Sequence, residues 1–219
     1  MLAAGVKAQH LVPGIVAVGG TAAALYAHHR VSVDTDHLLR GLRDRFDEVL
    51  QALNAAPEWK TARVSRPVLI LGSIDNVPVG LREPRRVTSI ETATVATPTG
   101  ELVVPTLPEM ISMKGFMLYS RNALRDYVDF AALARCATES VVLDALGKLD
   151  DDYRGLQTQS LRLEVAKSLA AARPYDLEST DLSRYKGLVP EWREWRRTEG
   201  ICRHFGALLG ERIALTDST

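Results

Sequence analysis

The sequence predicts an α+β fold, with strands in the first half of the chain and helices in the second. The first half contains short runs of β-branched and apolar residues bounded by turn signals, of which Val68–Leu71 and Val77–Leu81 are the clearest. Beyond Pro105–Pro108, which we interpret as a hinge, apolar residues recur at helical spacing. We therefore predict two lobes, residues 1–106 with a mixed sheet and residues 107–219 forming a helical lobe.

The remaining elements follow from the same apolar spacings and chain breakers. In the first half we predict a helix at Met1–Leu11, a strand ending at Val18, a helix at Thr21–His29, a strand at Arg30–Asp36, an amphipathic helix at His37–Ala55, and strands at Arg86–Val95 and Leu102–Val104 around a turn at Pro98–Gly100. In the second half we predict helices that begin at Pro108 and then cover Arg125–Arg135, Glu139–Leu149, Leu156–Ala172 and Pro190–Leu209. All strands are expected in one mixed sheet.

Composition limits the classes of function. The formal net charge is zero, so no overall basic field indicates a nucleic-acid partner, and any RNA contact must come from local patches. The two cysteines, Cys136 and Cys202, form no metal-binding pair and are typical of a reducing compartment. The apolar run Leu11–Ala27 is interrupted by Pro13 and by glycines, so we do not interpret it as a signal peptide. No stretch is long and apolar enough to span a membrane, and we expect a cytoplasmic protein.

A glycine pair followed by two aspartates is the clearest candidate site. Gly19 and Gly20 stand between a predicted strand and a helix, and Asp34 and Asp36 lie two apart on the next strand. Alternate residues of a strand share a face, so both carboxylates need solvent, basic partners or a divalent cation there. Mg²⁺ is typically held by one or two carboxylates together with substrate phosphates. Glycines before a helix let a phosphate approach the amide groups of its first turn. The pattern indicates a nucleotide site, although a solvated edge strand after a glycine turn would show the same residues.

This arrangement resembles the signature of the nucleotidyltransferase superfamily, in which a glycine and a small residue precede a D-x-D pair. The likeness is closer to the AbiEii/MenT group of bacterial nucleotidyltransferase toxins, whose members show GGT-A-L followed by R-x-S-x-D-x-D. The matching residues here are Gly19, Gly20, Thr21, Ala22 and Leu25, then Arg30, Ser32, Asp34 and Asp36. The resemblance implies that the Gly19–Thr21 segment cradles phosphates and that the two aspartates bind Mg²⁺.

A second stretch of likeness follows the predicted hinge. Members of the group show L-x-E-x-x-x-x-K, an arginine, and then R-D-x-x-D-L, and here these positions hold Lys114, Arg121, Asp126 and Asp129, with Phe130 in place of leucine. An ammonium group facing a cleft would hold the β- and γ-phosphates, whose charge metal ions do not fully neutralise. The two acids lie three apart on one helix face, where they would orient Lys114 or an arginine, or contact the nucleotide. An exposed helix with ordinary salt bridges is the alternative interpretation.

One position of the superfamily pattern has no clear match. Polymerase-like nucleotidyltransferases usually add a third carboxylate from a later strand. Asp75 and Glu91 are the candidates here, and neither lies in a convincing motif. Either one of them is the third ligand, or Asp126 or Asp129 substitutes for it.

Ser32 stands two residues before the first aspartate and so shares its face of the strand. It would either donate a hydrogen bond to the triphosphate or simply fill space in the strand. In the toxin group the corresponding serine looks like a point of inactivating phosphorylation, because added negative charge would repel a nucleotide. We therefore include Ser32 among the candidate nucleotide-binding residues.

These residues predict an enzyme that transfers a nucleoside monophosphate from an NTP, with Mg²⁺ as cofactor. Its candidate catalytic residues are Asp34, Asp36, Lys114, Asp126 and Asp129. By resemblance, the acceptor is the 3′ end of tRNA, the result is blocked translation, and a cognate antitoxin protein neutralises the enzyme. A transferase that modifies a small molecule such as an aminoglycoside, or a protein side chain, remains an alternative, as does a non-catalytic protein-binding module.

Local basic residues bear on this choice. Arginines in Arg82–Arg86 and Arg193–Arg203 favour RNA over a polycationic drug. In the second of these stretches, Trp192 and Trp195 would either stack on unpaired bases or pack their helix onto the lobe.

Overall fold

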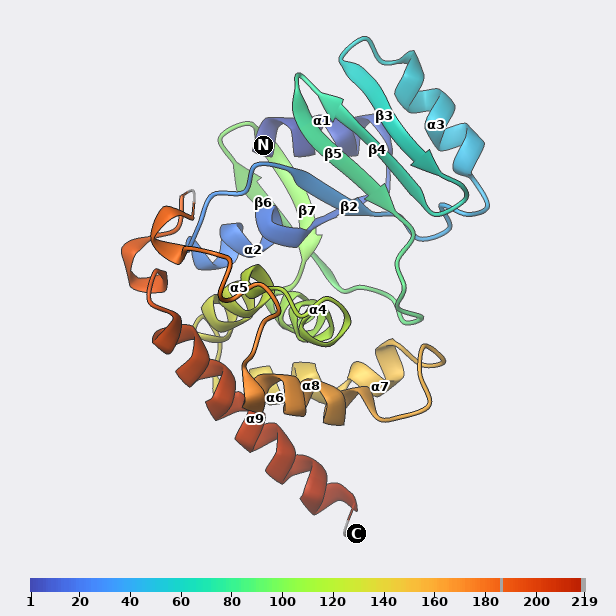
Figure 1. Cartoon of the computed structure of the whole chain (residues 1–219). Helices are drawn as coiled ribbons and strands as arrows, with labels where there is room; N and C mark the ends of the chain where they lie inside the picture. The colour runs from blue at the N-terminus through green and yellow to red at the C-terminus, as the bar shows by residue number, and fades with distance from the viewer. Residues whose placement is uncertain (186, 218–219) are drawn as a thin grey trace. The chain divides into compact units, whose positions relative to one another are not determined.

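The computed structural model of the chain describes residues 1–185 and 187–217 (Figure 1). They form two compact units. The first contains Met1–Leu25, Ser32–Arg85 and Ile90–Thr106, and the second contains Tyr26–Val31, Arg86–Ser89 and the chain from Leu107 onward. The second unit thus includes two short segments of the first half that no sequence signal indicated. The division into domains at residues 1–106 and 107–219 stays a prediction.

The first unit is built on a five-stranded mixed sheet with the strand order β1-β2-β5-β4-β3. Its strands are β1 (Val16–Val18), β2 (Thr35–Leu38), β3 (Trp59–Ser65), β4 (Leu69–Ile74) and β5 (Val77–Arg82). β2 pairs antiparallel with β1 and parallel with β5, and the other pairs are antiparallel. The predicted α+β fold with a mixed sheet is confirmed.

One face of this sheet packs against α1 (Leu2–Leu11) and α3 (Phe46–Ala55) to form the core of the first unit. Side chains alternate along β2, so Thr35 and His37 are fully buried on this face while Asp36 between them is partly exposed. Gly5 lets α1 lie close to β2, since a Cβ there would be 3.3 Å from Thr35 Oγ1. Asp36 therefore projects from the sheet face opposite to α1.

The helix predicted from His37 is wrong in its first part. β2 continues through Leu38, a series of turns follows, and α3 begins only at Phe46. Gly41 lies in these turns with φ +77°, a backbone conformation that favours glycine and ends any helix. The apolar spacing that predicted one long helix is shared between a strand, a turn and a shorter helix.

The last two strands of the first unit form a separate sheet. Within the described residues, β6 (Thr92–Thr97) pairs only with β7 (Gly100–Pro105), so the prediction of one sheet is wrong here. The strand predicted at Arg86–Val95 begins only at Thr92. Gln9 of α1 covers part of β7: its amide group donates to the Val103 carbonyl at 2.7 Å and accepts from the Val103 N–H at 2.9 Å. The turn predicted at Pro98–Gly100 joins the two strands.

The second unit is helical, although the helices predicted from Leu156 and Pro190 begin only at Leu161 and Trp195. Its elements are α4 (Leu107–Ser120), α5 (Leu124–Ala134), α6 (Glu139–Gly147), α7 (Leu149–Asp152), α8 (Leu161–Ala171), the 3₁₀ turns η1 (Leu182–Arg184) and η2 (Pro190–Trp192), and α9 (Trp195–Asp217). Gly206 allows α9 to cross α8 closely, since a Cβ there would lie 2.5 Å from the Ala170 nitrogen. Trp192 is 3% exposed, and Trp195 meets Tyr127 edge-on, so both tryptophans serve packing.

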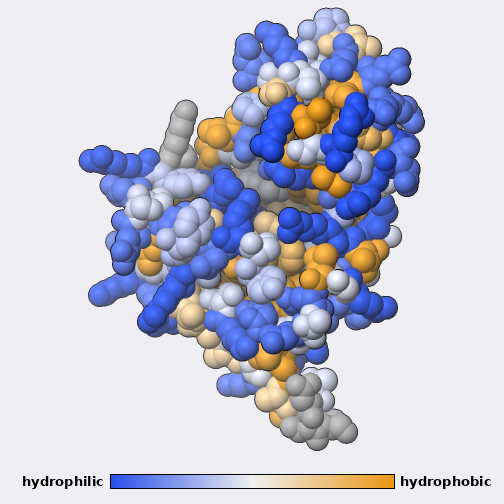
Figure 2. Space-filling view, turned by 45° about the vertical axis from the view of Figure 1, so that its right-hand side comes forward, coloured by the Kyte–Doolittle hydropathy of each residue, from blue (hydrophilic) through white to orange (hydrophobic). Residues whose placement is uncertain are grey.

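None of the described helices is long and apolar enough to cross a membrane. On the face shown in Figure 2, apolar residues are interspersed with hydrophilic ones.

Candidate functional site

Asp36 lies on β2 between β1 and β5. The strand β1 ends beside Asp36, and β5 has a glycine beside it. Val18, the last residue of β1, pairs with Asp36 on one side, and Gly80 of β5 pairs with it on the other. A Cβ at Gly80 would lie 2.5 Å from Asp36 Oδ1, and a Cβ at Gly19 would lie 3.4 Å from Asp36 Oδ2. The missing side chain at Gly80 therefore makes room for the carboxylate, whose side chain is 38% exposed.

Asp34 lies immediately before β2 and is fixed by two hydroxyl groups. Thr21 Oγ1 donates to the backbone carbonyl of Asp34 at 2.6 Å, and Ser32 Oγ donates to Asp34 Oδ1 at 2.9 Å. Both donors are nearly buried, at 4% and 5% exposure. These bonds support a positioning role for Thr21 and Ser32, while their predicted contact with nucleotide stays a prediction.

The predicted phosphate seat is the start of α2 (Gly19–Ala27), which follows β1 without a loop. Gly19 has φ +69°, which is unfavourable for any residue with a side chain and turns the strand directly into the helix. Because Val18 pairs with Asp36, the first turn of α2 begins beside that carboxylate. The amide groups and positive dipole end of such a turn attract phosphate oxygens.

Mg²⁺ binding by Asp34 and Asp36 stays a prediction, based on the carboxylates and substrate phosphates that typically hold this ion. Beside Asp36, the same face of β5 presents Gly80 and Arg82, and Arg82 Nε lies 4.0 Å from Asp36 Oδ1. A cation therefore already balances part of the carboxylate charge. Among the described residues, no group of three or more His, Cys, Asp or Glu side chains is placed to hold a metal ion.

The two candidates for a third carboxylate lie elsewhere in the first unit. Asp75 lies in the turn between β4 and β5, five residues before Gly80, which corresponds to roughly 16 Å along an extended strand. There it forms an ion pair with Lys7 at 2.7 Å. Glu91 precedes β6, outside the five-stranded sheet. Neither residue stands on the strand beside Asp36.

In the second unit, Lys114 of α4 is buried between Asp126 and Asp129 of α5. Its Nζ lies 3.1 Å from Asp126 Oδ1 and 2.6 Å from Asp129 Oδ2. The lysine is 4% exposed and both aspartates are fully buried. The alternative of an exposed helix with ordinary salt bridges is wrong, and the two acids orient Lys114 from within the core of the unit.

Two arginines and a histidine complete this buried network. Arg30 donates through Nε at 2.6 Å and Nη2 at 2.9 Å to the two oxygens of Asp129, and His29 Nε2 lies 2.7 Å from the same carboxylate. Arg121 makes the corresponding two-bond contact with Asp126, at 2.7 and 2.6 Å. Bidentate arginine–carboxylate pairs fix orientation as well as charge.

The electrostatic balance of the network keeps both acids ionised. Burial raises the pKa of Asp126 and of Asp129, but neighbouring cations outweigh this effect, with Lys114 the largest contributor for each. The pKa of Asp126 lies below its ordinary value and that of Asp129 well below it. The three cations Lys114, Arg30 and Arg121 thus face the two ionised carboxylates.

The predicted site residues form two clusters, one in each unit. The first contains Gly19, Gly20, Thr21, Ser32, Asp34 and Asp36, and the second contains Lys114, Asp126 and Asp129. Sequence reasoning missed Gly80, although a glycine inside a strand pattern indicates a close approach by another group. It also missed His29 and Arg30 as partners of Asp129, because nothing in the sequence joins residues 100 positions apart.

Comparison with solved structures identifies the fold. A candidate nucleotidyltransferase from H. pylori superposes on this chain with a TM-score of 0.53 and 14% sequence identity, covering 97% of each chain. An antigenic nucleotidyltransferase-like protein from Paracoccidioides brasiliensis shows 15% identity over 68% of this chain and 86% of its own, at a TM-score of 0.47, which is too low to support an argument. The chain therefore has the fold of the H. pylori protein.

Sequence comparison gives no family. No family model matches the chain. The heme uptake protein MmpL11 of Mycobacterium tuberculosis (strain ATCC 25618 / H37Rv) is 34% identical over 116 residues, which are 52% of this chain and 12% of that protein. The mycolic acid-containing lipids exporter MmpL11 of Mycolicibacterium smegmatis is 28% identical over 112 residues, 50% of this chain and 11% of its own length. The chain thus spans about an eighth of the curated relatives that it matches.

Proposed function

We propose that this protein is a Mg²⁺-dependent nucleotidyltransferase, which transfers a nucleoside monophosphate from an NTP to a hydroxyl group. The observation that carries the proposal is the Asp36 carboxylate, which lies partly exposed in the space that Gly80 leaves open and beside the first turn of α2. Asp34, two residues earlier in the chain, is fixed by hydrogen bonds from the hydroxyls of Thr21 and Ser32. The fold shared with the H. pylori protein supports the same reaction class.

The reaction exchanges a phosphoanhydride bond of the NTP for a phosphoester bond to the acceptor. The acceptor hydroxyl loses its proton, its oxygen forms a bond to the α-phosphorus, and the bond to the bridging oxygen breaks to release pyrophosphate. Asp34 and Asp36 would hold Mg²⁺, which neutralises phosphate charge and lowers the pKa of the attacking hydroxyl. The amide groups after Gly19 and Gly20 would bind phosphate oxygens at the N-terminus of α2.

The buried network of the second unit would act as a support for arginine side chains. Asp129 holds Arg30 and Asp126 holds Arg121 in fixed orientations, and Lys114 neutralises both acids. A preorganised cation costs no reorganisation when negative charge develops on phosphate. Direct contact between Lys114 and the triphosphate stays a prediction from the sequence. The ion pairs of Lys114 with Asp126 and Asp129 favour instead a role in positioning the two arginines.

For the acceptor we propose the 3′ end of tRNA, with blocked translation as the consequence and a cognate antitoxin as the inhibitor. This part of the proposal is supported by the likeness of the two motif segments to the AbiEii/MenT group. Within the first unit, Arg82 beside Asp36 adds a cation suited to a polyanionic substrate.

Incubation with each α-³²P-labelled NTP, MgCl₂ and total RNA tests the proposal. Wild-type protein is expected to label an RNA of tRNA size, and Asp36→Asn is expected to reduce labelling at least about 100-fold, as for loss of a metal-binding group. The matched control is Asp44→Asn, which removes an exposed carboxylate from the turns before α3 and should label RNA as wild type does.

The product separates the acceptor classes. Label found only in a small molecule or in protein would retain the transferase and overturn tRNA as the acceptor. No labelled product with any NTP, from protein with a folded circular dichroism spectrum, would overturn the enzymatic proposal itself.

A further inference from the structure

The hairpin of β6 and β7 has an outer edge with which no strand of the described chain pairs (Figure 1). Thr94 of β6 stands opposite Val103 of β7, and Gln9 of α1 bonds to both the N–H and the C=O of Val103. These two groups therefore point away from β6, which makes Thr94 and Val103 a non-hydrogen-bonded pair. The main-chain N–H and C=O of Thr94 accordingly point outward, and the alternation of an antiparallel ladder gives Thr92 and Ala96 the same direction.

This outer edge, which comprises Thr92, Thr94 and Ala96, is also open to solvent. All three residues are exposed. Among the described helices and strands, only β7 packs along β6. On the other side of the hairpin, the Gln9 side chain occupies the place of a further strand and closes the edge of β7. The hairpin thus has one closed edge and one open edge.

The outer strands of the five-stranded sheet are protected against further pairing, whereas β6 is not. β3 carries the exposed cations Lys60 and Arg63, and its register with β4 shifts between Thr61 and Arg63. β1, at the other edge of that sheet, is only three residues long. Charge, irregular register and short length each discourage the addition of a strand. β6 has six regularly paired residues that are β-branched or small, and none of them is charged.

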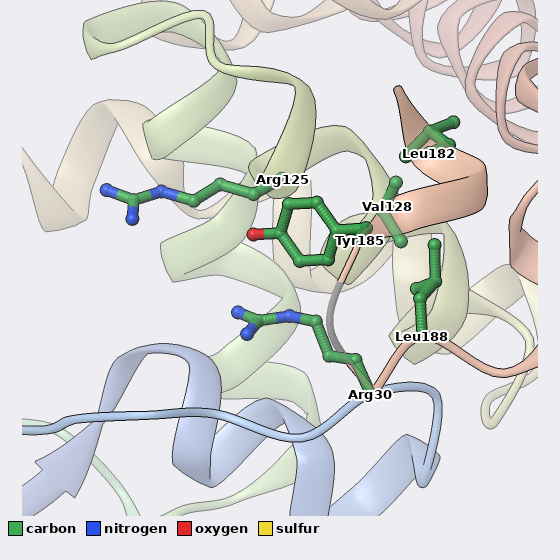
Figure 3. A pocket seen from close by; sticks show the side chains of 6 residues that line it. All are labelled: Arg30, Arg125, Val128, Leu182, Tyr185 and Leu188. Carbon is green, nitrogen blue, oxygen red and sulfur yellow. The ribbon is translucent and has the colours of Figure 1, made fainter. Parts of the chain in front are cut away.

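The small hollow in the second unit is no comparable binding surface among the described residues. It is lined by Arg30, Arg125, Val128, Leu182, Tyr185 and Leu188. Figure 3 shows the ring of Tyr185 between the side chains of the two arginines, and the lining residues themselves fill the space. The open edge of β6 is therefore the clearer docking element.

The sequence of β6 is suited to pairing with itself. When a second copy is added antiparallel to the open edge, about a two-fold axis at Thr94, this residue faces Thr94 of the copy and Thr92 faces Ala96. Opposed threonines stabilise a sheet, whereas a charge at the axis would meet the same charge of the copy. The nearest acids are Glu91 before the strand and Glu101 on β7, and in this register neither faces an acid of the copy.

We propose that β6 binds a second copy of this chain and joins two hairpins into a four-stranded antiparallel sheet. The bonds formed are main-chain N–H to C=O contacts of Thr92, Thr94 and Ala96, as in strand addition at other sheet edges. On the half-buried face, Ala93 would meet Val95 of the copy. One strand pair buries less than the roughly 1,600 Å² of a standard interface, so the expected dissociation constant is micromolar. This surface is independent of the proposed function.

Sedimentation velocity from about 1 µM to about 300 µM, a range that spans a micromolar dissociation constant, tests the proposal. Wild-type protein is expected to shift from monomer to dimer over this range. Thr94→Lys places like charges at the axis and should weaken dimerisation at least about 10-fold. The matched control Ala62→Lys adds the same charge to the exposed strand β3 and should dimerise as wild type does. Asp36→Asn should also dimerise as wild type does, so a failure of the dimer and a failure of transferase activity are separate results.

Disulfide cross-linking tests the register, in a Cys136→Ser background that removes the exposed native thiol. In Thr94→Cys the substituted position lies opposite its copy, at about 5.5 Å between Cα atoms, and should form a covalent dimer under mild oxidation. Thr92→Cys is the control, because its copy lies four residues further along the strand, about 14 Å away. A protein that stays monomeric, a dimer that Thr94→Lys leaves intact, or equal cross-linking of the two cysteine variants would overturn the inference. A monomer whose Thr94 N–H is protected from hydrogen exchange only when another protein binds would also overturn it, and would assign the edge to that partner.

Discussion

Replacing Lys114 by methionine is expected to destabilise the second unit strongly. Methionine keeps most of the volume of the lysine stem but removes the ammonium group that lies within 3.1 Å of Asp126 and 2.6 Å of Asp129. Breaking a buried ion pair by removing one partner costs about 3–5 kcal/mol. Since each aspartate keeps a bidentate arginine, we expect the lower end, about 3 kcal/mol. For a protein of this size, that loss lowers Tm by roughly 6–12 °C.

Circular dichroism at 222 nm, which reports helix content and therefore mainly the second unit, measures this shift. Lys167→Met is the matched control, because Lys167 is 60% exposed and pairs with Glu164 one turn earlier, an interaction worth under about 1 kcal/mol. A Tm for Lys114→Met no lower than that of the control would refute the reasoning from burial. If transfer activity were then lost at a temperature where the variant is folded, direct contact with phosphate would be the better account of Lys114.

Three further outcomes follow from the first unit. Gly80→Ala places a methyl group 2.5 Å from Asp36 Oδ1 and should reduce transfer activity about 10- to 100-fold without changing the circular dichroism spectrum, whereas Gly147→Ala, which meets nothing within 4 Å, should leave activity unchanged. Thr21→Val removes the hydrogen bond to the segment before β2 and should cost about 1 kcal/mol in urea denaturation; an unchanged midpoint would contradict this role. Burial lowers the pKa of His37 from 6.5 to about 4, so the unfolded chain takes up the proton first and stability is lost as pH falls from 6.5 toward 4. The loss reaches at most about 3 kcal/mol, and His37→Leu should flatten the pH dependence of urea unfolding over this range.

Sequence patterns predicted the strands of the first unit well where each turn residue was required only by the turn itself. The hairpin of β4 and β5 follows from apolar runs on either side of Asp75 and Asn76, which both adopt positive φ in the turn. The predicted run Val68–Leu71 ends before Gly72, whereas β4 continues to Ile74. That glycine lies inside β4, and a Cβ there would be 2.3 Å from the ring of Trp59 on β3. A glycine required by a distant side chain cannot be distinguished by sequence from a glycine required by a turn.

In the candidate site, too, local features could be predicted from the sequence and contacts between distant residues could not. The D-x-D pair could be predicted because both residues and their spacing are local, and Gly19 and Gly20 lie in the same stretch. The strand predicted at Arg30–Asp36 is wrong in its first part, because β2 begins only at Thr35 and Asp34 precedes it.

The arrangement around Lys114 could not be predicted. The spacing of Asp126 and Asp129 places them on one helix face but does not show that this face is buried. Nor does it show that Arg30, 99 residues before Asp129, donates to that carboxylate.

Because Lys114, Asp126 and Asp129 are buried, their presence is weaker evidence for catalysis than the motif alone indicates. Removing one member of a lysine and two aspartates that neutralise one another inside the protein is expected to destabilise that unit, whatever reaction the protein performs. Their presence therefore adds less support to catalysis than Asp36, which is partly exposed beside the space left by Gly80. It follows that the two substitutions should fail in different ways: Lys114→Met should lose stability first, and Asp36→Asn should lose chemistry in a protein that remains folded. A stable Lys114→Met variant together with an unfolded Asp36→Asn variant would reverse this assignment of roles.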